Sequence, residues 1–321
     1  MKYKITTISL LLVLAMGSGV VHAEQAALQW LIKMGKAAQD LNYRGIFVYQ
    51  HDLQLESMQI IHRVKRGITK ERLLSLNNAP REIIRDNNII RCYLPDEDSI
   101  VVEHRKANEK NFPRIIPKNL ARLKDSYSFL MGPKERVTDR MAQHVIVKPK
   151  DKYRYGYHLW ADLKSGLLLK SDLIDPEGKV LEQFMFTSLD IGVEIKDKDL
   201  EPRSSSLNLK KLLKSENKTP LEKTQWRVTS LPAGFVTTVH IKRTVPMHDE
   251  PVEHMVLTDG LAAVSVFIEK KRNLNQIVSG PNSMGAVNAY TRATSNHQIT
   301  VIGEVPAITV IKIARAVELS K

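Results

Sequence analysis

The stretch YRYGYHLWADLKSGLLLKSDLIDPEGKVLEQFMFTSLDIG, residues 153–192, alternates apolar and polar residues and breaks twice at clusters typical of turns. An alternation with a two-residue period is the pattern of half-buried strands. We therefore expect strands over residues 153–160, 167–174 and 180–193. The first turn falls at residues 162–166, and Asp175-Pro176-Glu177-Gly178 suits a type I turn. The stretch predicts antiparallel sheet.

Working outward toward the N-terminus, the same pattern recurs behind a helix. Apolar residues at spacings of three and four in EQAALQWLIKMGKAAQDLN, residues 24–42, predict an amphipathic helix. Strands are expected over residues 43–50, 58–65, 69–76, 81–85, 89–93 and 99–103. A proline-containing region with a possible short helix follows, and sheet resumes at residues 137–148. We predict a mainly β barrel or sandwich, curved around the helix, with room for an apolar concavity.

The chain reads as two domains. Residues 24–200 form the larger one, and a polar stretch at 201–222, in which LNLKKLL can form a helical turn or two, is interpreted as a linker. Residues 223–321 look like a small α/β domain. Its strands are expected over residues 235–245, 252–257, 262–270, 287–292 and 298–303, with a turn at Asp259-Gly260 and a helix starting at Pro306.

The first 23 residues predict export. Lys2 and Lys4 precede a short apolar run, and Val21-His22-Ala23 provides small residues for cleavage before Glu24. The alternative, an uncleaved anchor, is disfavoured because the run is shorter than the roughly 20 residues of a spanning helix. Cys92 is the single cysteine, which leaves burial in a strand or intermolecular pairing as its alternatives. We expect a soluble, exported protein, and the periplasm is its location according to the family resemblance given below.

Charge points to an anionic partner. The formal net charge is +13, and removal of Lys2 and Lys4 with the first 23 residues, which contain no acid, leaves +11. An exported basic protein meets anionic lipid, glycan or acidic protein segments. Nucleic acid is not expected as a partner in that compartment.

The sequence contains no clear catalytic motif. His248 and His254 are six residues apart with Pro251 between them, which does not fit a helical zinc site. We interpret this cluster as a solvated loop and residues 279–283 as another. No phosphate-binding glycine loop precedes a helix. We therefore predict a binding protein with no catalytic residues, no metal and no cofactor.

Several segments together resemble one known family, the RseB/MucB periplasmic regulators of the envelope-stress sigma factor. The resemblance covers essentially the whole mature chain. It is carried in the larger domain by residues 42–49, 71–76, 81–85, 92–95, 154–157, 166–170 and 181–183, and in the smaller one by residues 231–235, 258–261, 265–267 and 303–306.

The resemblance implies a lipoprotein-carrier-like fold, an unclosed antiparallel β-barrel around a helix, followed by a smaller α/β domain that binds the anti-sigma factor. The partner it implies is the periplasmic segment of a membrane-spanning anti-sigma factor, which the protein shields from proteolysis. Lipopolysaccharide or lipid is implied as the ligand that releases it. Self-association into a homo-oligomer is implied as well.

Candidate site residues follow from position. Arg81, Arg85, Arg91 and Lys150 flank strand ends and are candidates for lipid or anion binding, or else solvated charges. Gly234 and Phe235 are candidates for contact with the anti-sigma segment, with a core role as the alternative for Phe235.

Two other functions stay open. A lipid or lipoprotein carrier would share the barrel, but would not need the small domain. An exported hydrolase acting on anionic glycan would need a catalytic residue, such as one of the histidines.

Overall fold

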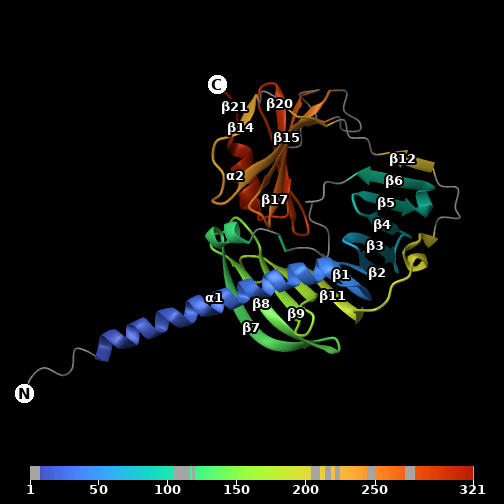
Figure 1. The fold of residues 1–321 in the computed structure, drawn as a ribbon. Helices are drawn as coiled ribbons and strands as arrows, with labels where there is room; N and C mark the ends of the chain where they lie inside the picture. The colour runs from blue at the N-terminus through green and yellow to red at the C-terminus, as the bar shows by residue number, and fades with distance from the viewer. Residues whose placement is uncertain are drawn as a thin grey trace, which may run out of the picture.

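The computed structural model describes residues 8–104, 116–117, 120–203, 210–213, 218–220, 225–243, 250–271 and 279–320. Two sheets dominate these residues, each with one α-helix (Figure 1). We call the 12-stranded sheet with α1 the large domain and the 7-stranded sheet with α2 the small domain. The mainly β, unclosed fold class predicted from sequence is confirmed.

The large domain is a strongly curved antiparallel sheet with a parallel strand added at one edge. Its order is β12-β6-β5-β4-β3-β2-β1-β11-β10-β9-β8-β7, and the end strands β12 and β7 do not pair with each other. The elements are α1 (Ile8–Asp40), β1 (Tyr43–His51), β2 (Gln54–Lys65), β3 (Ile68–Ser75), β4 (Glu82–Asp86), β5 (Ile89–Leu94), β6 (Ser99–His104), β7 (Tyr127–Val137), β8 (Arg140–Pro149), β9 (Gly156–Asp162), β10 (Leu168–Ile174), β11 (Val180–Ile191) and β12 (Lys210–Leu213). The short 3₁₀ helices are η1 (Pro95–Glu97), η2 (Ala121–Asp125) and η3 (Asp197–Leu200).

The small domain packs one helix on one face of its sheet. The sheet order is β13-β15-β16-β17-β20-β19-β18, and β14 pairs with β21 beside it. The elements are β13 (Lys218–Pro220), β14 (Trp226–Val228), β15 (Val236–Arg243), β16 (Val252–Thr258), β17 (Ala263–Lys270), β18 (Gly280–Met284), β19 (Val287–Ala293), β20 (His297–Gly303), α2 (Ala307–Arg315) and β21 (Val317–Leu319). Val310, Ile313 and Ala314 bury the apolar face of α2 in the core, as its spacing predicts.

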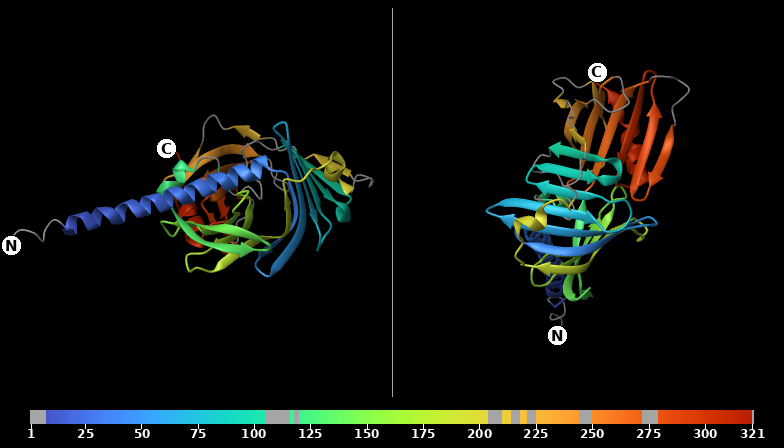
Figure 2. Two further views of the ribbon diagram at one scale, coloured as in Figure 1. Left: turned by 60° about the horizontal axis from the view of Figure 1, so that its bottom comes forward. Right: turned by 90° about the vertical axis from the view of Figure 1, so that its right-hand side faces the viewer.

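Helix α1 fills only part of the curved sheet. Leu31, Met34 and Ala38 are buried in the large core, and the helix contacts β7, β8 and β10 (Figures 1 and 2). The concave face of β1–β4 lies beyond it. The predicted cleavage site after Ala23 lies within this helix, and the signal peptide stays a prediction. Among the described residues, no helix combines the length and the apolar character needed to cross a bilayer.

Four edge strands differ from the sequence prediction. Strand β7 begins at Tyr127, ten residues before the predicted sheet, and residues 280–284, predicted as a loop, form β18. The predicted linker contributes β12, instead of a helical turn, and β13. Proline is tolerated in edge strands and at bulges, where no ladder hydrogen bond is lost. Pro133 sits at the register shift of β7, and Pro281 lies in edge strand β18.

The two domains are joined by a buried ion pair. Arg154, just before β9, is fully buried, and its Nη1 donates to Asp259 Oδ2 over 2.6 Å. Tyr127 donates its hydroxyl proton to the same oxygen over 3.0 Å. Arg154 Nη2 donates to Ala233 O, which is also in the small domain, over 2.6 Å. The guanidinium therefore bridges the domains through both terminal nitrogens.

Asp259 also shapes its own turn. Its Oδ1 accepts the backbone N–H groups of Leu261 and Ala262, at 2.8 and 2.7 Å. Gly260 has φ +104, a conformation that glycine adopts without strain. The predicted Asp259-Gly260 turn is confirmed, and it carries Leu261 into the core of the large domain. The Asp259 carboxylate thus stabilises the turn and also joins the two domains.

Loss of the Asp259 charge should destabilise the protein strongly. We predict that Asp259→Asn, which keeps an Oδ1 acceptor for the turn, lowers the free energy of unfolding by about 1.5–3 kcal/mol, because the hydrogen bond from Arg154 Nη1 loses its charged acceptor while Asp151 still pairs with Nε and Nη2. Urea titration measures the change. Arg154→Met combined with Asp259→Asn should recover part of the loss.

The matched control is the exposed pair of Arg44 and Asp190, whose side chains are 46% and 66% exposed. Arg44→Met should change the free energy of unfolding by less than about 1 kcal/mol, since exposed ion pairs contribute little. An Asp259→Asn effect as small as that of Arg44→Met would contradict the interdomain role.

Candidate ligand cavity between the domains

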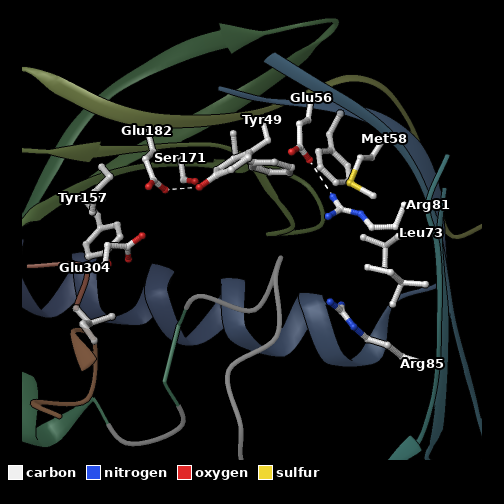
Figure 3. A pocket seen from close by; sticks show the side chains of 15 residues that line it. Tyr49, Glu56, Met58, Leu73, Arg81, Arg85, Tyr157, Ser171, Glu182 and Glu304 are labelled. Carbon is white, nitrogen blue, oxygen red and sulfur yellow. Dashed lines mark hydrogen bonds and ion pairs between the residues drawn. The ribbon is translucent and has the colours of Figure 1, made fainter. Parts of the chain in front are cut away.

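A cavity of about 440 Å³ occupies the part of the concave face that α1 leaves open (Figure 3). This is within the 300–1,000 Å³ range of small-molecule sites. Strands β1, β2, β3, β4, β9, β10 and β11 of the large domain supply its wall. The lining residues are Phe47, Tyr49, Glu56, Met58, Leu73, Arg81, Ile83, Arg85, Tyr157, Ser171, Leu173, Glu182 and Phe184, with Leu261 and Glu304 from the small domain.

The middle of the cavity is apolar. The rings of Phe47 and Phe184 meet edge to face, with centroids 5.1 Å apart. Met58, Leu73 and Leu173 extend this surface. Strand alternation explains the arrangement, because Phe47 and Tyr49 are two residues apart on β1 and therefore share its concave face. The wall suits an alkyl chain or an apolar side chain.

One end of the cavity carries carboxylates and phenols. Tyr49 donates its hydroxyl proton to Glu182 Oε2, and Glu304 of the small domain lies at the same end (Figure 3). Burial raises the pKa of Tyr49, and its hydrogen bond to Glu182 raises it further. Burial also raises the pKa of Tyr157. Both phenols therefore stay protonated at neutral pH.

The other end carries two guanidinium groups, Arg81 and Arg85 (Figure 3). Arg81 Nη2 donates to Glu56 Oε2 over 3.0 Å, and the Arg81 side chain is 41% exposed. Arg85 Nη1 donates to the Glu71 carboxylate, which is buried. Arg81 is thus the more accessible of the two, and a guanidinium in this setting can bind a phosphate through charge-assisted hydrogen bonds.

The small domain closes one side of the cavity. Leu261 and Glu304 reach it from two separate segments, the Asp259 turn and the end of β20. Because Leu261 directly follows Gly260 in the turn that Arg154 holds, the shape of the cavity depends on domain docking. The site belongs to both domains.

The sequence analysis also singled out a histidine cluster, His248 and His254, for its metal-ligand chemistry. No group of three or more potential metal ligands occurs among the residues that the structure describes. His248 lies outside them. His254 is in strand β16, where its ring stacks on Phe267 and its Nε2 lies 3.1 Å from Ser265 Oγ, so the predicted solvated loop is wrong for this residue.

Comparison with known proteins matches both domains. The family model described as the MucB/RseB N-terminal domain matches residues 26–204, and that of the MucB/RseB C-terminal domain matches residues 220–318. The chain belongs to the MucB/RseB family. The resemblance seen in the sequence is confirmed.

Individual relatives align over nearly the whole chain. Sigma factor AlgU regulatory protein MucB of Pseudomonas aeruginosa is 30% identical, covering 97% of each chain. Sigma-E factor regulatory protein RseB of Haemophilus influenzae is 28% identical, covering 98% of each. The solved complex of Pseudomonas aeruginosa MucA and MucB has a TM-score of 0.75 at 27% identity, covering 92% of this chain and 99% of that one.

In this member of the MucB/RseB family, two of the four predicted anion-binding residues line the cavity. Arg81 and Arg85 do so, whereas Arg91 on β5 is not among the lining residues. Lys150 lies in another part of the domain, where its Nζ donates to Lys124 O over 2.6 Å. All four residues were predicted because they flank strand ends, but these strand ends do not all lie at the cavity. Their ligand roles stay predictions.

Phe235 does not form an exposed anchor. Its side chain is 5% exposed and packs in the small-domain core, and the Arg154 guanidinium lies 5.2 Å from its ring centroid. The core alternative is therefore correct. Gly234 has φ +79 and borders the large domain, because a Cβ there would lie 2.3 Å from Ser126 Oγ. Its contact with an anti-sigma segment stays a prediction. Cys92 is half-buried in β5.

Sequence analysis missed Tyr49, Glu182, Leu261 and Glu304. Tyr49 could have been predicted, because it lies two residues after Phe47 in an expected strand and therefore faces the same side of the sheet. The other side chains reach the cavity only because β11 pairs with β1 and the small domain docks onto it. Neither the pairing nor the docking can be read from local pattern.

Binding of an alkyl phosphate should distinguish Arg81, which lines the cavity, from Arg91, which does not. We predict that Arg81→Gln weakens binding of dodecyl phosphate about tenfold or more, because a charge-assisted hydrogen bond contributes about 1.5–3 kcal/mol. Arg91→Gln, the matched control away from the cavity, should change the affinity less than about twofold. Isothermal titration calorimetry measures both, and equal effects of the two variants would contradict the site.

Proposed function

We propose that this chain is a periplasmic negative regulator of an envelope-stress sigma factor. It binds the periplasmic segment of a membrane-spanning anti-sigma factor, shields that segment from proteolysis and releases it when lipopolysaccharide or another lipid binds. The observation that carries the proposal is family membership over both domains. The solved structure of the relative MucB in complex with MucA(peri) supports the partner, with a TM-score of 0.73 and 28% identity over 92% of this chain.

The cavity supports a lipid as the releasing ligand. Its apolar middle accepts an alkyl chain, and Arg81 stands where a phosphate headgroup can bind. Burial of a twelve-carbon chain contributes on the order of 9 kcal/mol before ordering costs are subtracted. A shift from 99% to 1% in a two-state population needs about 5.5 kcal/mol of differential affinity. The gross free energy of burying one chain therefore exceeds the differential affinity that such a shift needs.

We infer binding without catalysis, which the names of the relatives as regulatory proteins support. The chain acts as a regulator, not as an enzyme, and the predicted signal peptide supports a periplasmic location. Self-association is a further prediction of the family resemblance. Its measurement by analytical ultracentrifugation is independent of the ligand.

A pull-down tests the regulatory proposal. The purified mature chain should retain the anti-sigma periplasmic segment from the same organism, and added lipopolysaccharide should reduce the retained amount by at least about tenfold, since allosteric couplings span roughly 5- to 150-fold. Arg81→Gln should require more lipopolysaccharide for the same release, whereas Arg91→Gln should behave like the parent.

Two outcomes would contradict the proposal. Absence of anti-sigma binding, both with and without lipopolysaccharide, would reject the regulatory function. A chain that binds lipid but does not bind the anti-sigma segment would instead be a carrier. Retention that lipopolysaccharide does not alter would reject lipid-triggered release.

A further inference from the structure

A second surface, outside the cavity, brings cations of both domains together. Lys148 is the penultimate residue of β8, and Lys150 and Lys152 follow in the segment that leads to β9. The small domain adds Lys312 and Arg315 from α2. We call these five residues the joint surface.

Contacts across the domain boundary fix the joint surface. Thr309 of α2 donates its hydroxyl proton to Tyr153 O over 2.8 Å. Lys312 Nζ lies 5.5 Å from the centroid of the Tyr153 ring. The segment at residues 150–153 is held on its other side, where the Lys150 amide donates to Ser126 O over 2.9 Å. Tyr153 therefore lies between the lysines of the large domain and the basic residues of α2.

Two open grooves flank this segment and expose apolar side chains beside the cations. A groove of about 550 Å³ is lined by Leu130 and Ile146 together with the three lysines. A groove of about 430 Å³ is lined by Ile308 and Ile311 together with Lys312 and Arg315. Leu130 is 43% exposed and Ile308 is 40% exposed.

The acidic side chains in and beside the first groove offset only part of the positive charge. Asp151 is paired with a cation outside the joint surface, because it accepts hydrogen bonds from Arg154 Nε and Nη2, at 3.0 and 2.9 Å. Asp175 accepts the backbone N–H groups of Glu177 and Lys179 and keeps its negative charge. Together with Asp125, exposed at the end of η2, it offsets two of the five positive charges. The joint surface keeps a positive excess.

We propose that the joint surface docks onto an anionic phospholipid bilayer. On α2, exposed Ile308 and half-buried Ile311 each lie one turn before a basic residue, Lys312 or Arg315, and such a mix of apolar and basic side chains suits a membrane interface. The cations come from separate elements and spread over both grooves, which suits a two-dimensional array of mobile headgroups. Docking would also hold the chain beside a membrane-spanning partner, an argument that rests on the proposed function.

Vesicle sedimentation tests this surface. The parent chain should bind vesicles of phosphatidylglycerol and phosphatidylcholine, but not vesicles of phosphatidylcholine alone. Each cation near an anionic surface contributes about 1 kcal/mol, or about fivefold, so Lys148→Gln with Lys152→Gln and Arg315→Gln should lower the partition coefficient about 100-fold. All three side chains are exposed, so their replacement should leave the fold intact.

The matched control removes the same charge elsewhere. Lys65→Gln with Lys164→Gln and Lys198→Gln changes three exposed lysines away from the joint surface. At 0.15 M salt this variant should bind vesicles within about threefold of the parent. Salt screens the attraction between the vesicle surface and charges that lie more than about 8 Å from it. Equal losses in the two triple variants would overturn the assignment, since net charge alone would then explain binding.

A second variant and a second ligand complete the test. Ile308→Ser, which keeps every charge, should weaken vesicle binding several-fold, and binding to poly-glutamate without binding to vesicles would overturn the membrane assignment. Both triple variants should retain the anti-sigma segment in the pull-down. If the parent chain does not retain the anti-sigma segment in that pull-down, the proposed function is rejected. Vesicle binding tests the role of the joint surface separately.

Discussion

The buried ion pair between Arg154 and Asp259 is the constraint on which the two-domain structure depends. Both side chains are withdrawn from water, so the Asp259 carboxylate requires the Arg154 cation, which Asp151 also pairs with. Tyr127 and Ala233 supply further hydrogen bonds that such a pair needs. The ion pair acts at the one turn that also carries Leu261 into the large domain, so a local electrostatic contact determines the relative position of two sheets.

The cavity is a consequence of how the large sheet is filled. A sheet that curves this strongly has more concave surface than α1 can cover, and the helix packs against β7, β8 and β10. Phe47, Phe184 and Leu73 line the remaining concave surface. Leu261 and Glu304 of the small domain close one side of it without filling it, and the result is an apolar space with an acidic end and a basic end.

Local pattern predicted the central strands and failed at the edges. The strands within residues 153–192 were expected to within a few residues, because both neighbours of a central strand impose the two-residue period. Strands β7, β12, β13 and β18 are the end strands of the two sheets, and all four departed from the prediction. An edge strand pairs on one side only, so it accepts proline and loses the alternation that identifies a strand.

The candidate site was predictable only in part. Arg81 and Arg85 were predicted because they flank strand ends, and the structure adds that their strand, β4, lines the cavity. Arg154 and Asp259 lie in segments that carried the family resemblance, yet nothing in the spacing along the chain indicates that they meet. Long-range contacts of this kind, like that of Glu304 with the cavity, depend on domain docking and not on local sequence.

The central claim is that domain docking forms the ligand cavity, and the affinity of dodecyl phosphate for Asp259→Asn tests it most directly. Asp259 does not line the cavity, so its replacement alters no contact with the ligand. The account predicts binding weaker than that of the parent by about 5- to 150-fold, the usual range of coupling between sites. An affinity equal to that of the parent, in a variant shown to be folded, would contradict it.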